Sequence, residues 1–205
     1  GVLDCKPADI FLKGAALPYS VSTTRRVPIP LLPKVEAELQ RMEKNGIIEK
    51  ASGPTEWCAP MVAVPKKSGQ VRICVDLRQL NKSVIREKRQ IPVLDDVIHK
   101  LAGSSVFSKL DAASGFWQIP LSKDSQKLTT FITPVGRFWF KRLPFGITSA
   151  PEVFQDRMEQ LLTGLPGVVV IMDDILIHGA DEAEHDERYN KVLEVLTKAG
   201  LKLNS

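Results

Sequence analysis

The chain has 205 residues, of which 43% are hydrophobic and 25% are charged, and its formal net charge at pH 7 is +4. This composition fits one large globular domain or two interleaved subdomains and excludes a fibrous or low-complexity chain. No apolar run approaches the roughly 20 residues that cross a bilayer, and no leader segment is visible, so we expect an intracellular protein without a membrane partner.

Positive charge gathers in one stretch of the chain and negative charge in another. Residues 64–90 contain eight lysines and arginines against two acidic residues, whereas residues 173–187 contain seven acidic residues and no lysine or arginine. Clustered basic charge attracts polyphosphate and releases its counterions. The basic stretch therefore favours a nucleic-acid partner, with a merely solvated basic face as the alternative.

The first part of the chain predicts one helix and one β-hairpin. Residues 1–32 are rich in proline and are expected to be irregular. A helix is predicted over 33–45, because Pro33 can begin it and Asn45-Gly46 can end it. Residues 59–64 and 71–77 are predicted strands joined by a basic turn. One face of the helix carries three apolar residues: Val35, Leu39 and Met42.

A second helix and a strand follow in the middle of the chain. The helix follows Pro92 and ends at Gly103. An alternating strand then ends at Asp111 and opens into small residues, so this carboxylate stands at a strand end. The helix residues expected to face inward are Leu94, Val97, Ile98 and Leu101.

The last part of the chain predicts two hairpins and two helices. Residues 128–133 and 138–141 form the first predicted hairpin, and a helix runs from Ser149 to Gly164. After the second hairpin, a helix with apolar residues on one side ends at Gly200. Those apolar residues are Tyr189, Val192, Leu193 and Leu196.

The second hairpin sets Asp173 and Asp174 between two apolar stretches within residues 168–177. Adjacent carboxylates held by apolar strands repel each other and lose hydration, which favours protonation unless a cation neutralises them. Divalent magnesium commonly does this. The pair alone leaves open the alternative of an Asp-Asp turn at the solvent end of a core hairpin.

Four segments, taken in order, resemble motifs of the reverse transcriptases of gypsy-type LTR retrotransposons. Besides the Asp173-Asp174 hairpin, they are Val75–Lys82, Ser105–Ile119 with its strand-end Asp111, and Leu143–Pro151. The resemblance extends over essentially the whole chain. Four ordered motifs make a chance likeness very improbable, whereas an isolated Asp-Asp pair would be weak.

The predicted fold is α+β. The order helix, strand, helix, Asp-Asp hairpin, helix predicts helices on one face of an antiparallel sheet. The resemblance implies the polymerase right-hand fold, with fingers formed by residues 1–86 and 119–150 and palm by residues 87–118 and 151–205. It also implies that thumb and ribonuclease H regions are absent from these residues. We therefore expect this chain alone to extend primers weakly or not at all.

The resemblance implies a catalytic and metal-binding set of three carboxylates: Asp111, Asp173 and Asp174. They would hold two Mg²⁺ ions, about 3.5–4 Å apart, for which Mn²⁺ can substitute. Met172 and Ile171 would lie near the primer or template. Ile171 departs from the family pattern, in which an aromatic residue is usual.

Further residues are expected to contact a deoxynucleoside triphosphate. Arg72 resembles the triphosphate-binding arginine of the family and would be joined by Lys66 or Lys67, although a Lys-Lys-Ser-Gly tip can also be a simple solvated turn. Backbone amides in the small-residue loop can receive phosphate oxygens. The loop residues are Ala112, Ala113, Ser114 and Gly115.

Two aromatic residues match family positions that lie near the nucleotide sugar. Phe116 would exclude a ribose 2′-hydroxyl, with core packing as the alternative. Phe145 would stack near the sugar from the Leu-Pro-Phe-Gly motif. Arg78 and Gly146 would lie near the primer or template, and Asp76 with Arg78 can equally brace the fingers.

The implied partners are an RNA or DNA template with its primer, deoxynucleoside triphosphates, and the remaining Pol regions, namely thumb, ribonuclease H and integrase. The implied location is the cytoplasm, including virus-like particles. Two other functions stay open. One is a noncatalytic nucleic-acid-binding or assembly module derived from a reverse transcriptase, and the other is an unrelated metal-dependent phosphotransferase.

Overall fold

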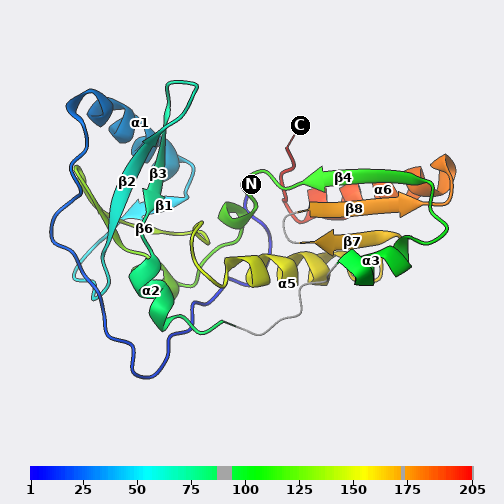
Figure 1. Ribbon diagram of the computed structural model, residues 1–205, viewed down its shortest axis with the longest axis horizontal. Helices are drawn as coiled ribbons and strands as arrows, with labels where there is room; N and C mark the ends of the chain where they lie inside the picture. Colours follow the sequence, from blue (N-terminus) through cyan, green and yellow to red (C-terminus); the bar gives the residue numbers. More distant parts are fainter. Residues whose placement is uncertain (87–93, 172–173, 205) are drawn as a thin grey trace. The chain divides into compact units, whose positions relative to one another are not determined.

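The structure is a computed structural model that describes residues 1–86, 94–171 and 174–204 (Figure 1). The chain divides into two compact units, each built from separated segments. Unit 1 comprises Gly1–Lys6, Glu87–Ile119 and Ala150–Ser205, and unit 2 comprises Pro7–Arg86 and Pro120–Ser149. Residues 1–6, which the sequence prediction grouped with residues 7–86, are thus part of unit 1.

Unit 2 contains a five-stranded sheet in the order β1-β6-β5-β2-β3. Neighbouring strands are antiparallel except β2 and β5, which are parallel. The strands are β1 (Ile48–Lys50), β2 (Ala59–Pro65), β3 (Val71–Val75), β5 (Phe131–Thr133) and β6 (Gly136–Phe140).

The β2–β3 hairpin confirms the sequence prediction for this region. Its register runs from Met61 opposite Val75 to Pro65 opposite Val71. Val71 is buried and Arg72 is exposed, because successive side chains of a strand point to opposite faces. The hairpin therefore presents Arg72 to solvent.

The helices of unit 2 agree with the sequence prediction only in part. Helix α1 (Leu32–Lys44) ends at Asn45, and it packs against β1 and β3. As predicted, it buries Val35, Leu39 and Met42. Two six-residue helices were not predicted, α2 (Arg78–Ser83) and α4 (Lys123–Leu128). The predicted start of a strand at residue 128 was therefore wrong, because Leu128 ends α4 and β5 begins at Phe131.

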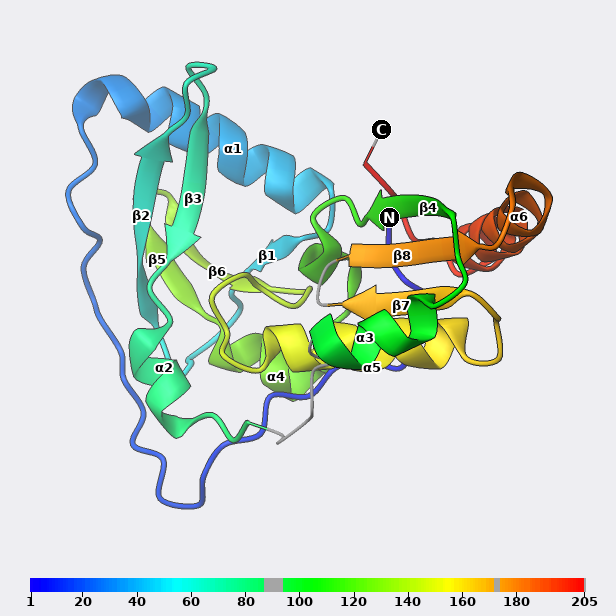
Figure 2. The ribbon, with the colours of Figure 1, turned by 45° about the vertical axis from the view of Figure 1, so that its right-hand side comes forward.

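Unit 1 contains a three-stranded antiparallel sheet in the order β4-β8-β7 (Figure 2). Its strands are β4 (Val106–Asp111), β7 (Val168–Ile171) and β8 (Asp174–Gly179). β7 and β8 form the predicted Asp-Asp hairpin, and β8 begins three residues after the last residue of β7. Two predicted site residues in this connection, Met172 and Asp173, lie outside the described residues.

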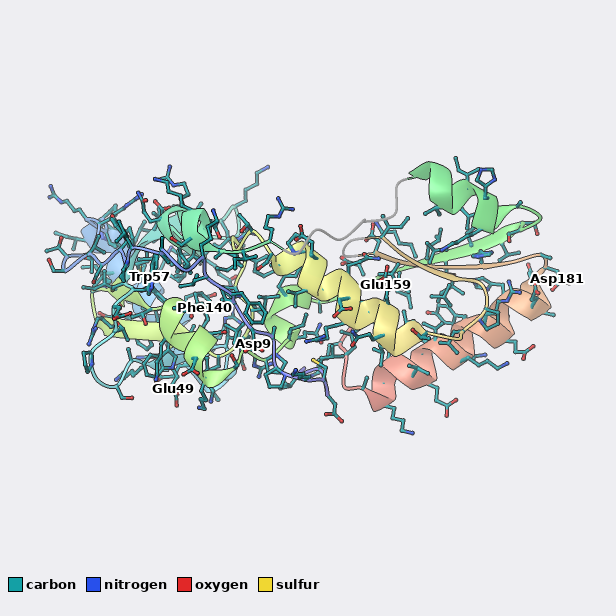
Figure 3. All side chains as sticks on the ribbon, turned by 90° about the horizontal axis from the view of Figure 1, so that it is seen from below. Asp9, Glu49, Trp57, Phe140, Glu159 and Asp181 are labelled. Atoms are coloured by element: carbon teal, nitrogen blue, oxygen red, sulfur yellow. The ribbon has the colours of Figure 1, made fainter. Side chains whose placement is uncertain are left out.

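Three helices accompany the sheet of unit 1: α3 (Leu94–Leu101), α5 (Ala150–Leu162) and α6 (Glu182–Lys198). Helix α5 packs against β7, and α6 packs against β8 and β4. Both lie on the same side of these strands, whereas α3 lies on the other side (Figures 1 and 3). The α+β class with an antiparallel sheet is confirmed, whereas the position of α3 departs from the predicted arrangement of helices on one face of the sheet.

Helix α3 does not bury all four residues expected to face inward. Val97 is buried, but Ile98 is 53% exposed. Neighbouring helical residues point about 100° apart, so an eight-residue helix that turns Val97 inward directs Ile98 away. The prediction for Ile98 was therefore wrong, and the side chain of Leu94 lies outside what the structure describes.

Candidate active site

Asp111 and Asp174 are direct cross-strand partners in unit 1. Asp111 is the last residue of β4, Asp174 is the first residue of β8, and the antiparallel register sets them opposite each other. Opposed residues of an antiparallel pair project their side chains from the same face, about 4.5–5.5 Å apart at Cβ. Two of the three predicted carboxylates are thus brought together, although they are 63 positions apart by residue number. Ile171 is opposite Asp174 on the other side.

A lysine contacts one carboxylate of this pair. Lys109 Nζ lies 2.7 Å from Asp174 Oδ2, and the two side chains are 62% and 42% exposed. Lys109 stands two residues before Asp111, so both side chains project from the same face of β4. The hydrogen bond that Lys109 donates to Asp174 raises the pKa of Lys109, and the charges of Asp174 and Asp111 add to this effect.

The C-terminal segment contacts the other carboxylate. Asn204 Nδ2 donates to Asp111 Oδ2 at 2.9 Å, and the Asn204 backbone N–H donates to the Asp111 carbonyl oxygen at 2.9 Å. Leu203 forms an antiparallel bridge with Ala112, and the Ala113 N–H donates to the Lys202 carbonyl oxygen. Residues 202–204 therefore run as a short extended segment beside Asp111.

Gln118 fixes this C-terminal segment to the loop after Asp111. Its side chain is buried, and Nε2 donates to the carbonyl oxygens of both Ala113 and Lys202 at 2.8 Å. The Lys202 N–H donates back to Gln118 Oε1 at 2.7 Å. A buried amide with these bonds satisfied locks two backbone segments in one register. Sequence reasoning assigned no role to Lys109, Gln118 or Asn204.

The loop after Asp111 is compact and partly closed to ligands. The Ala113 amide, one of the expected phosphate donors, is already bonded to Lys202. Ser114 adopts the left-handed conformation, with φ 50°. Gly115 is buried, and a Cβ there would lie 2.8 Å from Phe154 Cε2. Only a residue without a side chain fits at this close approach.

Phe116 follows in the short 3₁₀-helix η2 (Gly115–Gln118). Its ring contacts that of Phe154 edge-on, with centroids 5.8 Å apart, and Phe154 is fully buried. Phe116 itself is half-buried. The ring thus contributes to packing while keeping some exposed surface, which leaves its role beside a nucleotide sugar a prediction.

The predicted triphosphate-binding cations lie in unit 2. Arg72 is on the exposed face of β3, and Lys66 and Lys67 are in the turn before it. Within the described residues, their three side chains make no hydrogen bond or ion pair with protein. The aspartates belong to unit 1, so joint binding of one nucleotide by these cations and the aspartates stays a prediction.

Asp76 and Arg78 pair with each other. Arg78 donates from Nε and Nη2 to the two Asp76 oxygens at 2.8 and 2.7 Å, and Arg25 Nη2 donates to Asp76 Oδ2 at 2.7 Å. The hydrogen bond from Arg78 is the main reason that the pKa of Asp76 is held well below its usual range. This geometry favours the bracing role, and a template contact by Arg78 stays a prediction.

Asn81 supports the loop that carries Phe145 and Gly146. Its Nδ2 donates to the Gly146 carbonyl oxygen at 2.7 Å, and Oδ1 accepts from the Thr148 N–H at 3.0 Å. Gly146 has φ 94°, a conformation that glycine adopts readily. Phe145 remains 47% exposed at the tip of the loop.

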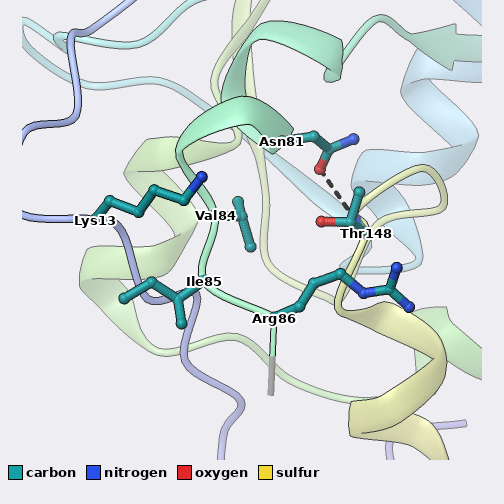
Figure 4. A pocket seen from close by; sticks show the side chains of 6 residues that line it. All are labelled: Lys13, Asn81, Val84, Ile85, Arg86 and Thr148. Carbon is teal, nitrogen blue, oxygen red and sulfur yellow. Dashed lines mark hydrogen bonds between the residues drawn. The ribbon is translucent and has the colours of Figure 1, made fainter. Parts of the chain in front are cut away.

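A hollow of about 520 Å³ opens beside Asn81 (Figure 4). Lys13 and Arg86 contribute positive charge to its wall, and Lys13 Nζ donates to the Lys82 carbonyl oxygen at 2.9 Å. No sequence pattern predicts this hollow, because Lys13 lies in the irregular N-terminal segment. All lining residues are Lys13, Asn81, Val84, Ile85, Arg86 and Thr148.

Two features are absent from the described residues. These residues contain no group of three or more His, Cys, Asp or Glu side chains placed to hold a metal ion, but Asp173 lies outside them. Within the same residues, no helix is both long and apolar enough to span a bilayer.

Comparisons with known proteins agree with the motifs. Residues 64–205 match the family model described as reverse transcriptase (RNA-dependent DNA polymerase). The chain is 34% identical over 200 residues to the transposon Tf2-3 polyprotein of Schizosaccharomyces pombe, covering 92% of this chain and 15% of the polyprotein. It is 32% identical over 187 residues to a retrovirus-related Pol polyprotein from transposon 412 of Drosophila melanogaster, covering 87% of this chain and 15% of the polyprotein.

A solved structure is similar over the whole chain. It is the foamy viral protease-reverse transcriptase in complex with an RNA/DNA hybrid, with TM-score 0.82 and 26% sequence identity. The similarity covers 100% of this chain and 27% of that chain. The present chain thus spans about a seventh of the transposon polyproteins and about a quarter of the foamy viral chain.

Proposed function

The chain belongs to the reverse transcriptase family, and from this premise we propose that it supplies the fingers and palm of an RNA-directed DNA polymerase within the Pol polyprotein of a gypsy-type retrotransposon. Unit 1 would be the palm and unit 2 the fingers. The observation that carries this proposal is the register of Asp111 with Asp174 at the end of a hairpin whose connection contains Asp173 in sequence.

The described residues fit a divalent metal ion. Two carboxylates project from one face of a sheet, and an ammonium group already lies against one of them as a stand-in cation. Carboxylate oxygens are the ligands that Mg²⁺ prefers. We propose that Asp111, Asp173 and Asp174 hold two Mg²⁺ ions, with Mn²⁺ as a substitute. When bound, the ions would activate the primer 3′-hydroxyl and neutralise the leaving pyrophosphate.

The protein's own contribution is to fix the carboxylates. Asn204 engages one oxygen of Asp111 and leaves the other oxygen for a ligand. Gln118 hydrogen-bonds the backbone of Lys202, two residues before Asn204, and so fixes the segment that carries Asn204. This arrangement orients a metal ligand before substrate arrives, which is the kind of preorganisation that efficient catalysis requires.

The proposed substrates are deoxynucleoside triphosphates and a primer on an RNA or DNA template. The foamy viral relative is seen with an RNA/DNA hybrid, which supports the same class of partner here. Arg72, Lys66 and Lys67 are exposed cations suited to phosphate groups. The remaining Pol regions would complete the enzyme, in the cytoplasm or in virus-like particles.

Primer extension tests the proposal. We define the extended chain as this sequence joined at its C-terminus to the region that follows the matching domain in the Tf2-3 relative. With Mg²⁺, it should incorporate deoxynucleotides on RNA and DNA templates, and the 205-residue chain should do so weakly or not at all. Template binding without incorporation by the extended chain would favour the noncatalytic module. Phosphotransfer that needs no template would contradict the proposal.

A further inference from the structure

The ion pair between Lys109 and Asp174 suggests how the carboxylate site is held before metal binds. We propose that Lys109 is a tethered counterion of the active-site carboxylates, which a divalent ion must displace from Asp174, so that Lys109 sets the metal affinity of the site. This inference rests on the proposed function, because it concerns the same metal site.

The carboxylate pair needs a counterion. Asp111 and Asp174 are opposite each other on adjacent strands, and like charges in such positions destabilise a sheet. Asn204 bonds Asp111 through a neutral amide, which orients the carboxylate but adds no positive charge. Lys109 supplies that charge, with Nζ 2.7 Å from Asp174 Oδ2.

The position of Lys109 allows it to leave. Its side chain is 62% exposed, and its one hydrogen-bonding or ionic partner in the described part of the chain is this carboxylate. A lysine side chain has a flexible four-carbon stem and a strongly hydrated ammonium group. Lys109 can therefore return to water without leaving a buried group unpaired.

Metal and ammonium compete for the same place. A metal ion held by Asp111 and Asp174 would take the Asp174 carboxylate that now accepts from Lys109 Nζ, and the two cations would repel each other. Metal binding must displace Lys109 and therefore loses the favourable energy of the ion pair. Removal of the Lys109 charge should make metal bind more tightly.

Metal titration of the 205-residue chain tests this inference. The probe is Mn²⁺, followed by the electron paramagnetic resonance signal of free Mn²⁺ at constant ionic strength, with thermal unfolding measured in parallel. Lys109→Met removes the charge at similar length, and Lys109→Arg keeps it. Lys191→Met is the matched control, because Lys191 is also exposed and also pairs with one carboxylate, that of Glu187. Asp111→Asn defines nonspecific binding.

The expected result is a lower Kd for Lys109→Met, by about three- to thirtyfold. This variant should also unfold at a lower temperature without metal and gain more in melting temperature from Mn²⁺. Lys109→Arg and Lys191→Met should bind Mn²⁺ like the wild type. A purely structural role for Lys109 would lower the melting temperature equally with and without metal.

Three outcomes would overturn the inference. Equal Mn²⁺ affinity of Lys109→Met and Lys191→Met would show that Lys109 does not compete, and weaker binding by Lys109→Met would show that it assists. In both cases the metal site of the proposed function would stand. Wild-type binding no greater than that of Asp111→Asn would remove the metal site itself and the inference with it.

Discussion

Asn204 donates two hydrogen bonds to Asp111, from its side-chain amide to Oδ2 and from its backbone N–H to the carbonyl oxygen, each at 2.9 Å. The side-chain bond restricts the carboxylate to one orientation. The backbone bond keeps residues 202–204 alongside the end of β4. A proposed metal ligand is thus positioned by a residue 93 positions away in the sequence.

Asn204→Ala should lower the rate of primer extension by the extended chain about ten- to a hundredfold, because small errors in the placement of a reacting group have effects of this size. The backbone bond does not need the side chain, so the fold should persist. Single-turnover extension with saturating template and nucleotide measures the effect, and circular dichroism checks the fold. A rate within twofold of the wild type would contradict a positioning role for Asn204.

Asp111→Asn should reduce extension by the extended chain to less than about a hundredth of the wild-type rate, because it removes a proposed metal-ligand charge without changing shape. Repulsion with Asp174 is also removed, so the melting temperature without metal should stay equal or rise. Asp173→Asn should abolish extension as well. Substantial activity of either variant would contradict the assignment of these carboxylates.

Local patterns in the sequence predicted the elements that place the carboxylates. The alternation of residues 106–110 and the apolar stretches around Asp173-Asp174 gave β4, β7 and β8. Both signals follow from the periodicity of side chains along a strand and require no knowledge of distant contacts. The sheet order β4-β8-β7 then brings Asp111 beside Asp174.

The parts that sequence reasoning missed depend on distant contacts or on short elements. Asn204 and Gln118 act through partners 93 and 84 positions away, and no local pattern marks such pairs. Helix α4 has only six residues, too few to show helical periodicity, and it buries the polar Ser125 and Gln126. The sequence pattern places Lys109 on a strand, two residues before Asp111. Its ion pair with Asp174 could not be predicted, because it depends on the register of β4 with β8.

Gly115→Ala should destabilise the 205-residue chain by about 1–3 kcal/mol, the range typical of overpacked sites. The added Cβ would lie 2.8 Å from Phe154 Cε2, and Phe154 is fully buried and cannot move freely. Urea unfolding measures the change. Gly14→Ala is the matched control, because a Cβ at Gly14 would meet nothing within 4 Å. Equal stability of the two variants would show that Phe154 can move to accommodate the added Cβ without loss of folding free energy.

Phe116→Ala should reduce the preference of the extended chain for deoxynucleotides over ribonucleotides by at least about tenfold, or about 1.4 kcal/mol of lost discrimination. The exposed part of the half-buried Phe116 side chain is proposed to exclude the 2′-hydroxyl. The loss of its contact with Phe154 should also lower the melting temperature. Incorporation of both nucleotide types, measured alongside thermal unfolding, separates these effects. An unchanged preference with lower stability would assign Phe116 to packing alone.

His178→Gln should make the free energy of unfolding less dependent on pH between pH 7.5 and 5. His178 is 7% exposed, and its Nδ1 lies 2.7 Å from Ser104 Oγ. Burial, reinforced by the charge of Arg188, lowers the pKa of His178 below its ordinary 6.5. The unfolded chain therefore takes up a proton near pH 6.5, whereas the folded chain resists it until lower pH, so stability is lost as pH falls through this window.

Urea unfolding at several pH values measures the slope of the unfolding free energy against pH. An unchanged slope in His178→Gln would exclude His178 as a source of this pH dependence.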